Sequence, residues 1–269
     1  MSESFNIAIA GIAGRMGRQV LEAALEAGHD VTGGSERDVS HHVGEPIGSL
    51  IQSDSLDAEI AADPLIASHE ADAWIDFTAP AVTLFDLAAL SQSSVHAVII
   101  GTTGFDREEQ KRIEEFGERF AIVKAGNFSL GVNLLTGLTR LAAERLGEDW
   151  DIEILETHHR HKVDAPSGTA LMFGDAAAEG RGRPLDEVQR LPYLVTDAKR
   201  RAGEIGFSVR RAGGVIGDHE VTFGSEDELI SLRHTALDRR VFARGAIKAA
   251  EWAMAQEPGY YTMDDVLGL

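Results

Sequence analysis

FNIAIAGIAGRMGR, residues 5–18, decides the fold, because an apolar run ends in three glycines at every third position and an amphipathic stretch follows. This pattern predicts a buried strand over residues 5–10, a glycine turn, and a helix over residues 15–27 that Gly28 can cap. A strand, a tight turn and a helix in this order open a nucleotide-binding sheet. The sequence therefore predicts an α/β fold.

The three glycines have separate tasks in a nucleotide-binding βα unit. Gly11 would make the tight turn, Gly14 would let backbone N–H groups approach a pyrophosphate, and Gly17 would let the helix pack closely on the sheet. Arg15 can add a charged contact to phosphate. The spacing is GxxGxxG rather than GxGxxG, so an ordinary βα turn remains an alternative.

An acidic residue follows the second predicted strand, which is expected over residues 29–34. Glu36 lies 25 positions after Gly11, where a carboxylate can accept hydrogen bonds from ribose hydroxyls. Arg37 beside it can pair with a 2′-phosphate, so the two residues are compatible with either NADH or NADPH. An exposed pair of charges in a turn is the alternative.

Strands and helices continue to alternate through the first half of the chain. We predict strands over 73–77, 97–100 and 120–123, with helices over 80–90 and 106–118 between them. These elements predict a Rossmann-like, doubly wound parallel sheet. The loops after the last two strands, GTTG and AGNF, fall where the carboxyl ends should form a crevice. Their hydroxyl and amide groups can hydrogen-bond to a carboxamide or ribose.

After residue 127 the pattern changes to long helices and strands that alternate polar with apolar residues. We expect a helix over 133–146, a strand over 152–157, and three antiparallel-looking strands over 205–210, 219–223 and 229–235. They predict a central α+β domain with an open mixed sheet, whose exposed face is a place for subunits to meet. A last helix over 241–255 is apolar on one side and can return to pack on the first domain.

HHRHKVDAPSGT, residues 158–169, crowds three imidazoles, one guanidinium and one ammonium into five positions. A chain with a formal net charge of −19 has little reason for this cluster unless it meets an anion or moves protons. The PSGT that follows is typical of a loop leading into a helix, expected over 170–178, whose first N–H groups attract a carboxylate or phosphate. If the preceding strand continues, His159 and His161 share one face and the other three residues share the opposite face. A solvated basic loop is the alternative, and the spacing disfavours a zinc site.

The composition limits the possible partners. The chain has 44 acidic and 25 basic residues, so nucleic acid is not expected as a partner. It has no cysteine, which excludes disulfides and thiolate sites, and no apolar run long enough for a membrane span or a secretory leader. We therefore expect a cytoplasmic protein without a membrane partner. Only five lysines on an acidic surface suggest, as a hypothesis, life at high salt.

Five motifs together resemble the dihydrodipicolinate reductase family, also called 4-hydroxy-tetrahydrodipicolinate reductase, over nearly the whole chain. They are AGIAGRMGR at 10–18, IDFTAP at 75–80, IGTTGFD at 100–106, NFSLGVN at 127–133 and ETHHRHKVDAPSGTAL at 156–171. The last string is the most specific. The chain departs from the family's usual residues at Ile12-Ala13 and Gly126 and in the link from 174 to 192. These departures bear on cofactor preference more than on the reaction.

The resemblance implies an enzyme of the diaminopimelate route to lysine that reduces 4-hydroxy-tetrahydrodipicolinate to tetrahydrodipicolinate with NADH or NADPH. It implies a dinucleotide-binding domain made of residues 1–130 with 240–269, and a substrate-binding and oligomerisation domain of residues 131–239. It also implies a homotetramer that acts on a small dicarboxylate heterocyclic substrate.

The resemblance assigns roles to individual residues as well. His158 matches the acid/base histidine and Lys162 the proton-donating lysine, whereas His159, Gly168 and Thr169 match substrate contacts. Cofactor-binding positions are matched by Gly11, Ile12, Ala13, Gly14, Arg15, Met16, Glu36, Arg37, Gly101, Thr102, Thr103, Ala125, Gly126, Asn127 and Phe128. Positions near the adenosine end are matched by Arg239 and Phe242, and no metal is expected.

Two other functions stay open at this point. Another two-domain Rossmann reductase, acting on a small amino acid, would also need an acid/base lysine. The HHRHK run joined to DAPSGT suits two carboxylates on one ring better than a single aldehyde. A nucleotide-sensing regulator would keep the glycine turn and Glu36, but it has no use for the proton-transfer cluster.

Overall fold

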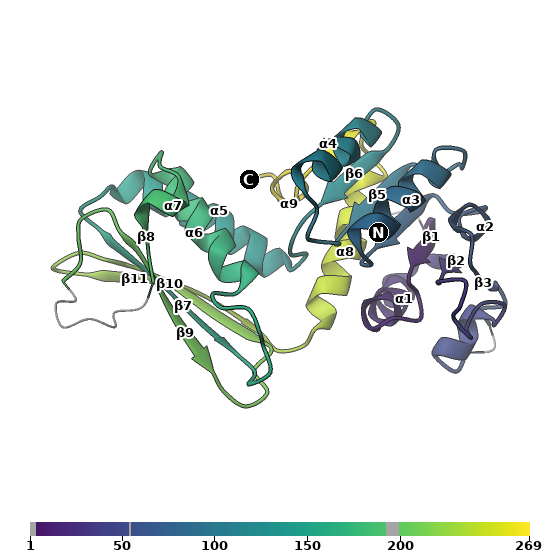
Figure 1. Cartoon of the computed structure of the whole chain (residues 1–269), viewed down its shortest axis with the longest axis horizontal. Coiled ribbons are helices and arrows are strands. Elements are labelled where there is room, and N and C mark those ends of the chain that lie inside the picture. Colours follow the sequence, from purple (N-terminus) through teal and green to yellow (C-terminus); the bar gives the residue numbers. More distant parts are fainter. Residues whose placement is uncertain (1–3, 54, 192–198) are drawn as a thin grey trace. The chain divides into compact units, whose positions relative to one another are not determined.

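The computed structural model describes residues 4–53, 55–191 and 199–269, which fall into two compact units (Figure 1). The terminal unit comprises Met1–Ser129 with Arg240–Gly268, and the central unit comprises Leu130–Arg239 with Leu269. One contains a parallel sheet and the other a mixed sheet. The fold class expected from the sequence, a Rossmann-like domain plus an α+β domain with an open mixed sheet, is therefore confirmed.

The terminal unit is built on seven parallel strands in the order β12-β6-β5-β4-β1-β2-β3. Their bounds are β1 Asn6–Ala10, β2 Asp30–Ser35, β3 Ile60–Ala61, β4 Ala73–Asp76, β5 Ala97–Ile100, β6 Ala121–Lys124 and β12 Gly259–Tyr261. The order runs outward in one direction from β1 through β2 and in the other from β4 through β6. A sheet of this kind has its ligand crevice at the carboxyl ends of the strands, where the order reverses.

Both faces of this sheet are covered, because successive residues of its strands enter two different cores. Ile7 and Ile9 of β1 join one core with α1 and α8, whereas Ala8 and Ala10 join the other with α3 and α4. The helices are α1 Arg15–Ala27, α2 Pro64–Ala67, α3 Pro80–Leu90, α4 Arg107–Phe116, α8 Arg240–Ala253 and α9 Met263–Leu267, with a 3-10 turn at Ile47–Leu50. The expectation that the last long helix packs on the first domain is confirmed by the contacts of α8 with α1, β5 and β6.

The first helix matches its prediction at both ends. α1 runs from Arg15 to Ala27, and Gly28 ends it with a left-handed φ of +86°, donating its N–H to carbonyls of the last turn. α3 also matches its predicted bounds. The short elements β3, α2, β12 and α9 were not predicted, since two to five residues carry too little periodicity to be recognised.

The central unit is built on a five-stranded sheet in the order β11-β10-β7-β9-β8. Its strands are β7 Asp151–His158, β8 Gln189–Arg190, β9 Ile205–Arg211, β10 Gly217–Gly224 and β11 Leu229–Ala236, and its helices are α5 Leu130–Leu146, α6 Gly168–Gly180 and α7 Leu185–Val188. α5 and α6 pack against one face (Figure 1), where Phe173 of α6 shares a core with Phe207 and Phe223 of the sheet. Along β10, buried residues alternate with partly exposed ones, as in a sheet with one covered face.

One expectation about this sheet is wrong. β9 was expected to be antiparallel like its successors, but it pairs in parallel with β7 and β8, and β7 separates it from β10. The loop between β9 and β10 does not close a hairpin, because it bonds back to the end of β7: the N–H of Ala212 donates to the His158 carbonyl at 2.8 Å. The N–H of Arg160 donates to the Gly213 carbonyl at 3.2 Å.

None of the helices in the described ranges combines the length and the apolar character needed to cross a bilayer.

Candidate active site

The glycine turn between β1 and α1 has the backbone geometry that close approach of a phosphate requires. Gly11 has a φ of +59°, and its carbonyl accepts a hydrogen bond of 2.9 Å from the N–H of Gly14. A Cβ at Gly17 would lie 2.3 Å from the Gly11 carbonyl oxygen and 2.6 Å from Ile12 Cα, so any side chain there would push turn and helix apart. α1 begins after Gly14, which has no side chain to cap the first N–H groups, and these groups suit an anion.

The Glu36 carboxylate lies against this turn. Its Oε1 accepts a hydrogen bond of 3.1 Å from the N–H of Ala13. Glu36 is partly buried, Arg37 beside it is exposed, and the Ile12 side chain is buried in the core. The structure thus brings Glu36 to the glycine turn and leaves Arg37 free of the core.

Three cavities of the terminal unit share wall residues and form one row. A cavity of about 310 Å³ is lined by Gly11, Gly14, Arg15, Met16, Gly17, Glu36, Phe77 and Thr78. A cavity of about 570 Å³ is lined by Gly11, Ser35, Glu36, Arg37, Ala62, Pro64, Thr78, Ala79, Ala81, Val82, Phe85 and Asp86. A cavity of about 280 Å³ is lined by Met16, Phe77, Gly101, Thr103, Gly126, Asn127, Phe128 and Phe242. A row with the glycine turn at its middle has the layout that an extended dinucleotide needs.

The loops that follow β5 and β6, residues 101–104 and 125–128, are called the crevice loops. Some of their residues line the 280 Å³ cavity, and others contact the surrounding structure. Thr102 and Ala125 do not line it. The Thr102 Oγ1 accepts a hydrogen bond of 2.9 Å from the Thr78 N–H and donates one of 3.1 Å to Asp76 Oδ1, and the Ala125 N–H donates to the Ile100 carbonyl at 3.1 Å. Thr102 therefore holds the loop in place, and its neighbours face the cavity.

Phe242, which the resemblance places near the adenosine end, lines the 280 Å³ cavity of the crevice loops and not the 570 Å³ cavity that Glu36 and Arg37 line. Arg239 is exposed and belongs to the central unit.

Asp86 is a buried carboxyl group in the wall of the 570 Å³ cavity, and 3% of its surface is exposed. Burial, and then the neighbouring Asp76 carboxylate, raises the pKa of Asp86 to about 8. The folded state therefore keeps a proton that the unfolded state releases above its ordinary pKa of 3.8. Stability from this group is present at low pH and is lost as the pH rises from about 4 to about 8.

We predict that Asp86→Asn stabilises the protein at pH 8, by about 1–3 kcal/mol, because the amide needs no proton to be neutral. Urea unfolding of both proteins at pH 5, 6.5 and 8 measures the difference, which should widen with pH. A difference that stays constant across this range would show that the titration of Asp86 does not affect stability.

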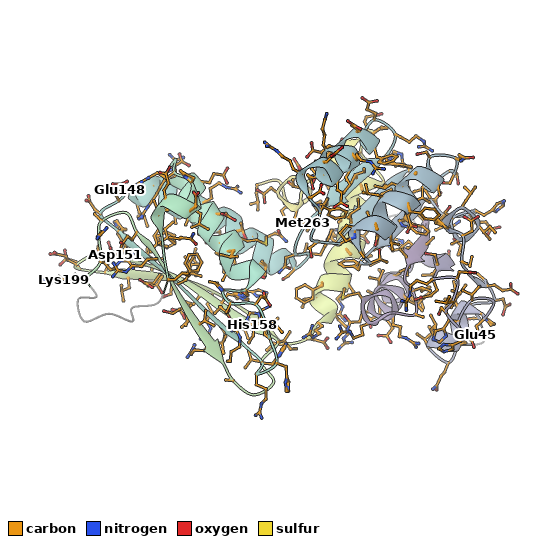
Figure 2. The ribbon with its side chains drawn as sticks, viewed as in Figure 1. Glu45, Glu148, Asp151, His158, Lys199 and Met263 are labelled. Atoms are coloured by element: carbon orange, nitrogen blue, oxygen red, sulfur yellow. The ribbon has the colours of Figure 1, made fainter. Side chains whose placement is uncertain are left out.

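The histidine-rich segment lies in the central unit, where β7 ends at His158 (Figure 2). Residues 159–162 form a turn in which the Lys162 N–H donates to the His159 carbonyl at 3.2 Å. The expectation of two alternating faces is therefore wrong beyond His158, because the ladder with β9 and β10 stops there. Arg160 and His161 are exposed, while His159 and Lys162 are partly buried.

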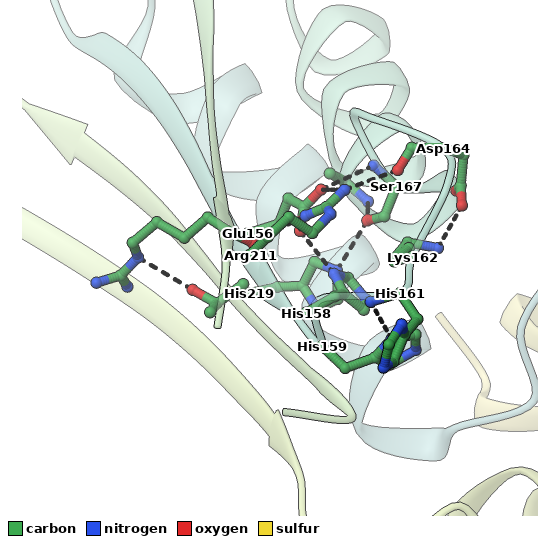
Figure 3. Close-up of polar contacts among 12 residues, drawn as sticks. Glu156, His158, His159, His161, Lys162, Asp164, Ser167, Arg211 and His219 are labelled. Atoms are coloured by element: carbon green, nitrogen blue, oxygen red, sulfur yellow. Dashed lines mark hydrogen bonds and ion pairs between the residues drawn. The ribbon is translucent and has the colours of Figure 1, made fainter. Parts of the chain in front are cut away.

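His158 is held by a buried carboxylate. Its Nδ1 lies 2.6 Å from Oε2 of Glu156, two residues earlier on the same face of β7 (Figure 3). Arg211 at the end of β9 binds both oxygens of this carboxylate, at 2.8 Å and 3.0 Å. Although burial alone would raise it, hydrogen bonds from Arg211 and His158 hold the pKa of Glu156 below its ordinary value. The carboxylate is therefore ionised at neutral pH.

The start of α6 adjoins this cluster. α6 begins at Gly168, two residues before the predicted start, with Ser167 as its N-cap: the Ala170 N–H donates to Ser167 Oγ at 3.1 Å. The same hydroxyl lies 3.1 Å from Nε2 of His219. Gly168 is exposed and Thr169 partly exposed, so the first turn of α6 offers N–H groups at the surface of the cluster.

Lys162 faces the same end of α6. Its Nζ donates to Asp164 Oδ1 at 2.8 Å, and this hydrogen bond holds the pKa of the Asp164 carboxyl below its ordinary value. A hydrogen bond from the Gly168 N–H lowers that pKa further. A carboxylate of the chain itself thus lies between the ammonium group and the helix N-terminus.

His159 lies in the same turn as Lys162. Partial removal from water, and then the charge of Arg239, lowers the pKa of His159.

Two family sequence profiles match the chain. The profile described as "Dihydrodipicolinate reductase, N-terminus" matches residues 5–128, and "Dihydrodipicolinate reductase, C-terminus" matches residues 131–267. The chain belongs to the dihydrodipicolinate reductase family. Membership confirms the resemblance drawn from the five motifs and the expectation of an oxidoreductase. It does not favour a two-domain reductase of another kind.

Relatives within the family cover the full length of the chain. The 4-hydroxy-tetrahydrodipicolinate reductase of Parvibaculum lavamentivorans is 48% identical over 273 residues, covering 100% of each chain. That of Ruegeria pomeroyi is 48% identical over 265 residues, covering 98% of each. A solved structure, "Dipicolinate bound Dihydrodipicolinate reductase" from a Paenisporosarcina species, has the same fold, with a TM-score of 0.76, 24% identity, and coverage of 97% and 98%. A reductase of this family with a Rossmann-like fold uses a nicotinamide cofactor.

Four residues around His158 carry no role in the predictions from the sequence: Glu156, Ser167, Arg211 and His219. Glu156 could have been found, since it precedes His158 by two positions and so shares its face of the strand. Arg211 and His219 carry no local signal, because only the pairing of β9 and β10 with β7 brings them to His158.

Proposed function

We propose that this member of the dihydrodipicolinate reductase family reduces 4-hydroxy-tetrahydrodipicolinate to tetrahydrodipicolinate with NADH or NADPH. One observation carries the proposal: a buried carboxylate–histidine pair, an ammonium group and the N-terminus of a helix lie together in the central unit. A small dianionic ring needs cations and N–H donors for its carboxylates and an acid for its reduction. The names of the full-length relatives support the same substrate.

The terminal unit fits the cofactor. A Cβ at Gly17 would lie 2.3 Å from the Gly11 carbonyl oxygen and one at Gly101 would lie 2.0 Å from the Phe77 ring, so glycine keeps α1 close to the glycine turn and the loop after β5 close to Phe77. We propose that Gly11–Met16 hold the pyrophosphate, that Glu36 and Arg37 hold the adenosine ribose, and that the crevice loops hold the nicotinamide end. When bound, the reduced nicotinamide supplies the hydride.

The residues of the central unit would bind the substrate and move the proton. His159 and the N–H groups of Gly168 and Thr169 would bind and orient the carboxylates, which an otherwise acidic surface repels. The 4-hydroxyl group and a neighbouring ring hydrogen leave as water, and Lys162 or His158 would supply the proton that balances the hydride, a contribution of about 10² to 10⁴ in rate. Lys162 must leave Asp164 to contact a substrate carboxylate or ring nitrogen.

Glu36→Gln is expected to shift cofactor preference toward NADPH by about tenfold, or ~1.4 kcal/mol. The amide oxygen can still accept the Ala13 N–H, but the charge that repels a 2′-phosphate is gone. Titration of each coenzyme by fluorescence gives the two Kd values. Asp38→Asn, which removes an exposed charge two positions away, is the matched control. Equal changes in both Kd values would argue against contact between Glu36 and the ribose.

The function is tested by adding the purified protein to freshly made cyclic substrate and following nicotinamide absorbance with each coenzyme, in low and high salt. We expect rapid oxidation of the coenzyme with this substrate and none with an amino-acid aldehyde. Oxidation of the coenzyme with the amino-acid aldehyde but not with the cyclic substrate would instead favour a two-domain reductase that acts on a small amino acid. Full activity and stability in dilute buffer would remove the hypothesis of a high-salt habitat.

We also propose that the protein is a cytoplasmic homotetramer. The open face of the central sheet supports this proposal, because its strands leave alternate residues uncovered. Light scattering after size-exclusion chromatography gives the mass, and a monomer would contradict the proposal.

A further inference from the structure

Glu156 is a buried carboxylate whose acceptor positions are filled. Its Oε2 faces His158 Nδ1 at 2.6 Å and an Arg211 nitrogen at 2.8 Å, and its Oε1 faces a second Arg211 nitrogen at 3.0 Å and the Ser167 N–H at 3.2 Å. Arg211 and a backbone amide can only donate, so the two oxygens are already acceptors in three of these four contacts. A proton on Oε1 would break one of them, and a proton on Oε2 would remove the negative charge that pairs with Arg211.

This arrangement decides which nitrogen of His158 carries hydrogen. Since the Glu156 carboxylate is ionised, the short contact at 2.6 Å requires Nδ1 to be the donor. In the neutral ring Nε2 is then the acceptor, and in the charged ring Nε2 holds the proton that can leave. A carboxylate fixes the tautomer of the catalytic histidine of serine proteases in the same way.

His158 is buried, with 7% of its surface exposed, and its Nε2 lies near Gly217. A Cβ at Gly217 would lie only 3.3 Å from this nitrogen, so glycine keeps its side open. The titratable groups around the ring are Glu156 with its partner Arg211, the neighbouring His159 and, with ring centroids 5.0 Å apart, His219 of β10 (Figure 3). Burial, and then His158, lowers the pKa of His219 to about 4, so His219 stays neutral beside the ring.

Glu156 also joins the other parts of the cluster. Through the Ser167 N–H it holds the residue that caps α6, and through Arg211 it reaches the Lys162 loop, because Arg211 also donates to the Asp164 carbonyl at 2.7 Å. One carboxylate therefore sets the positions of His158, the helix N-terminus and the loop that carries Lys162.

We propose that Glu156 is the positioning residue of this active site, which fixes the Nδ1–H tautomer of His158 and presents Nε2 for proton transfer. This inference rests on the proposed function for its kinetic consequence, but not for the tautomer itself. A purely structural role would require only that the buried Glu156 carboxylate be paired with Arg211, and would leave the tautomer of His158 undetermined.

The first test is ¹⁵N NMR of the imidazole rings of the wild-type protein, which needs no turnover. The chain has ten histidines, so His158→Gln identifies the signals of His158 by their loss. We expect the neutral ring of His158 to be protonated at Nδ1. Protonation at Nε2 would overturn the proposal, even if the protein reduces the proposed substrate at full rate.

The second test is Glu156→Gln. The amide must place its NH₂ group against an Arg211 donor, so the carboxamide cannot reproduce the four contacts. We expect the tautomer of His158 to change and kcat to fall by about 10²-fold with unchanged coenzyme Kd.

Glu179→Gln is the matched control, since it also removes a carboxylate that binds an arginine, Arg140 at 2.9 Å, but at the exposed side of α6. It should leave kcat and the tautomer as in the wild type. A Glu156→Gln protein that unfolds like the wild type and keeps both would overturn the proposal. A wild-type protein without turnover but with the expected tautomer would instead overturn the proposed substrate.

Discussion

Lys162→Ala is expected to lower kcat by about 10² to 10⁴ while leaving the Kd for NADH and NADPH within about twofold. The ammonium group is the cation that lies at the N-terminus of α6, paired with Asp164, and its removal takes away both a proton donor and a partner for a substrate carboxylate. The proposed cofactor cleft belongs to the other unit, so its contacts stay intact. Single-turnover absorbance gives the rate, and coenzyme fluorescence gives the Kd.

Arg160→Ala is the matched control for this prediction. It removes an exposed cation from the same turn, two positions earlier, and should change kcat far less. His158→Ala should resemble Lys162→Ala, because both residues are proposed to take part in protonation. Weakened coenzyme binding with normal turnover at saturating coenzyme would contradict the roles given to Lys162 and His158.

Gly17→Ala is expected to weaken binding of both coenzymes by about 10- to 100-fold. The new Cβ would meet backbone atoms of Gly11 and Ile12, which cannot rotate away as a side chain can. Displacing them by overpacking costs about 1–3 kcal/mol and moves the N–H groups that face the pyrophosphate. Calorimetric titration with each coenzyme measures the loss, and thermal unfolding should show a lower Tm.

Glu22→Ala, on the exposed side of α1, is the control for Gly17→Ala. It also introduces alanine into this helix but meets no backbone atom, and it should leave the coenzyme Kd unchanged. Tight coenzyme binding by Gly17→Ala would mean that the pyrophosphate does not depend on the glycine turn.

The terminal unit was largely predictable because its signals are local. The strand, glycine turn and α1 are encoded within residues 5–28, and the left-handed Gly28 ends the helix where the pattern predicts. Edge elements were not predictable. β12 is three residues long and is held by its pairing with β6, whose partner residues are more than a hundred positions earlier.

The candidate active site was predictable only where its residues are contiguous. The charge and composition of the run from His158 to Thr169 indicate anion binding and proton transfer. Its geometry does not, because the end of β7 depends on pairing with β9 and β10, and Arg211 binds Glu156 from 55 positions away. Local pattern therefore identified the residues that are proposed to react, whereas tertiary pairing supplied the arginine that holds the Glu156 carboxylate.

The return of the chain to the terminal unit imposes an order on biosynthesis. α8 and β12 complete a core and a sheet whose other strands precede residue 130, whereas the central unit, apart from Leu269, is continuous in sequence. A ribosome therefore releases every residue of Leu130–Arg239 before it has made the last strand of the parallel sheet. The apolar face that α8 covers stays open during that interval, and at ~5–20 residues per second the synthesis of 110 residues, Leu130–Arg239, holds it open for about 5–20 s. Chaperones that shield apolar surface on nascent chains have their opportunity in this interval.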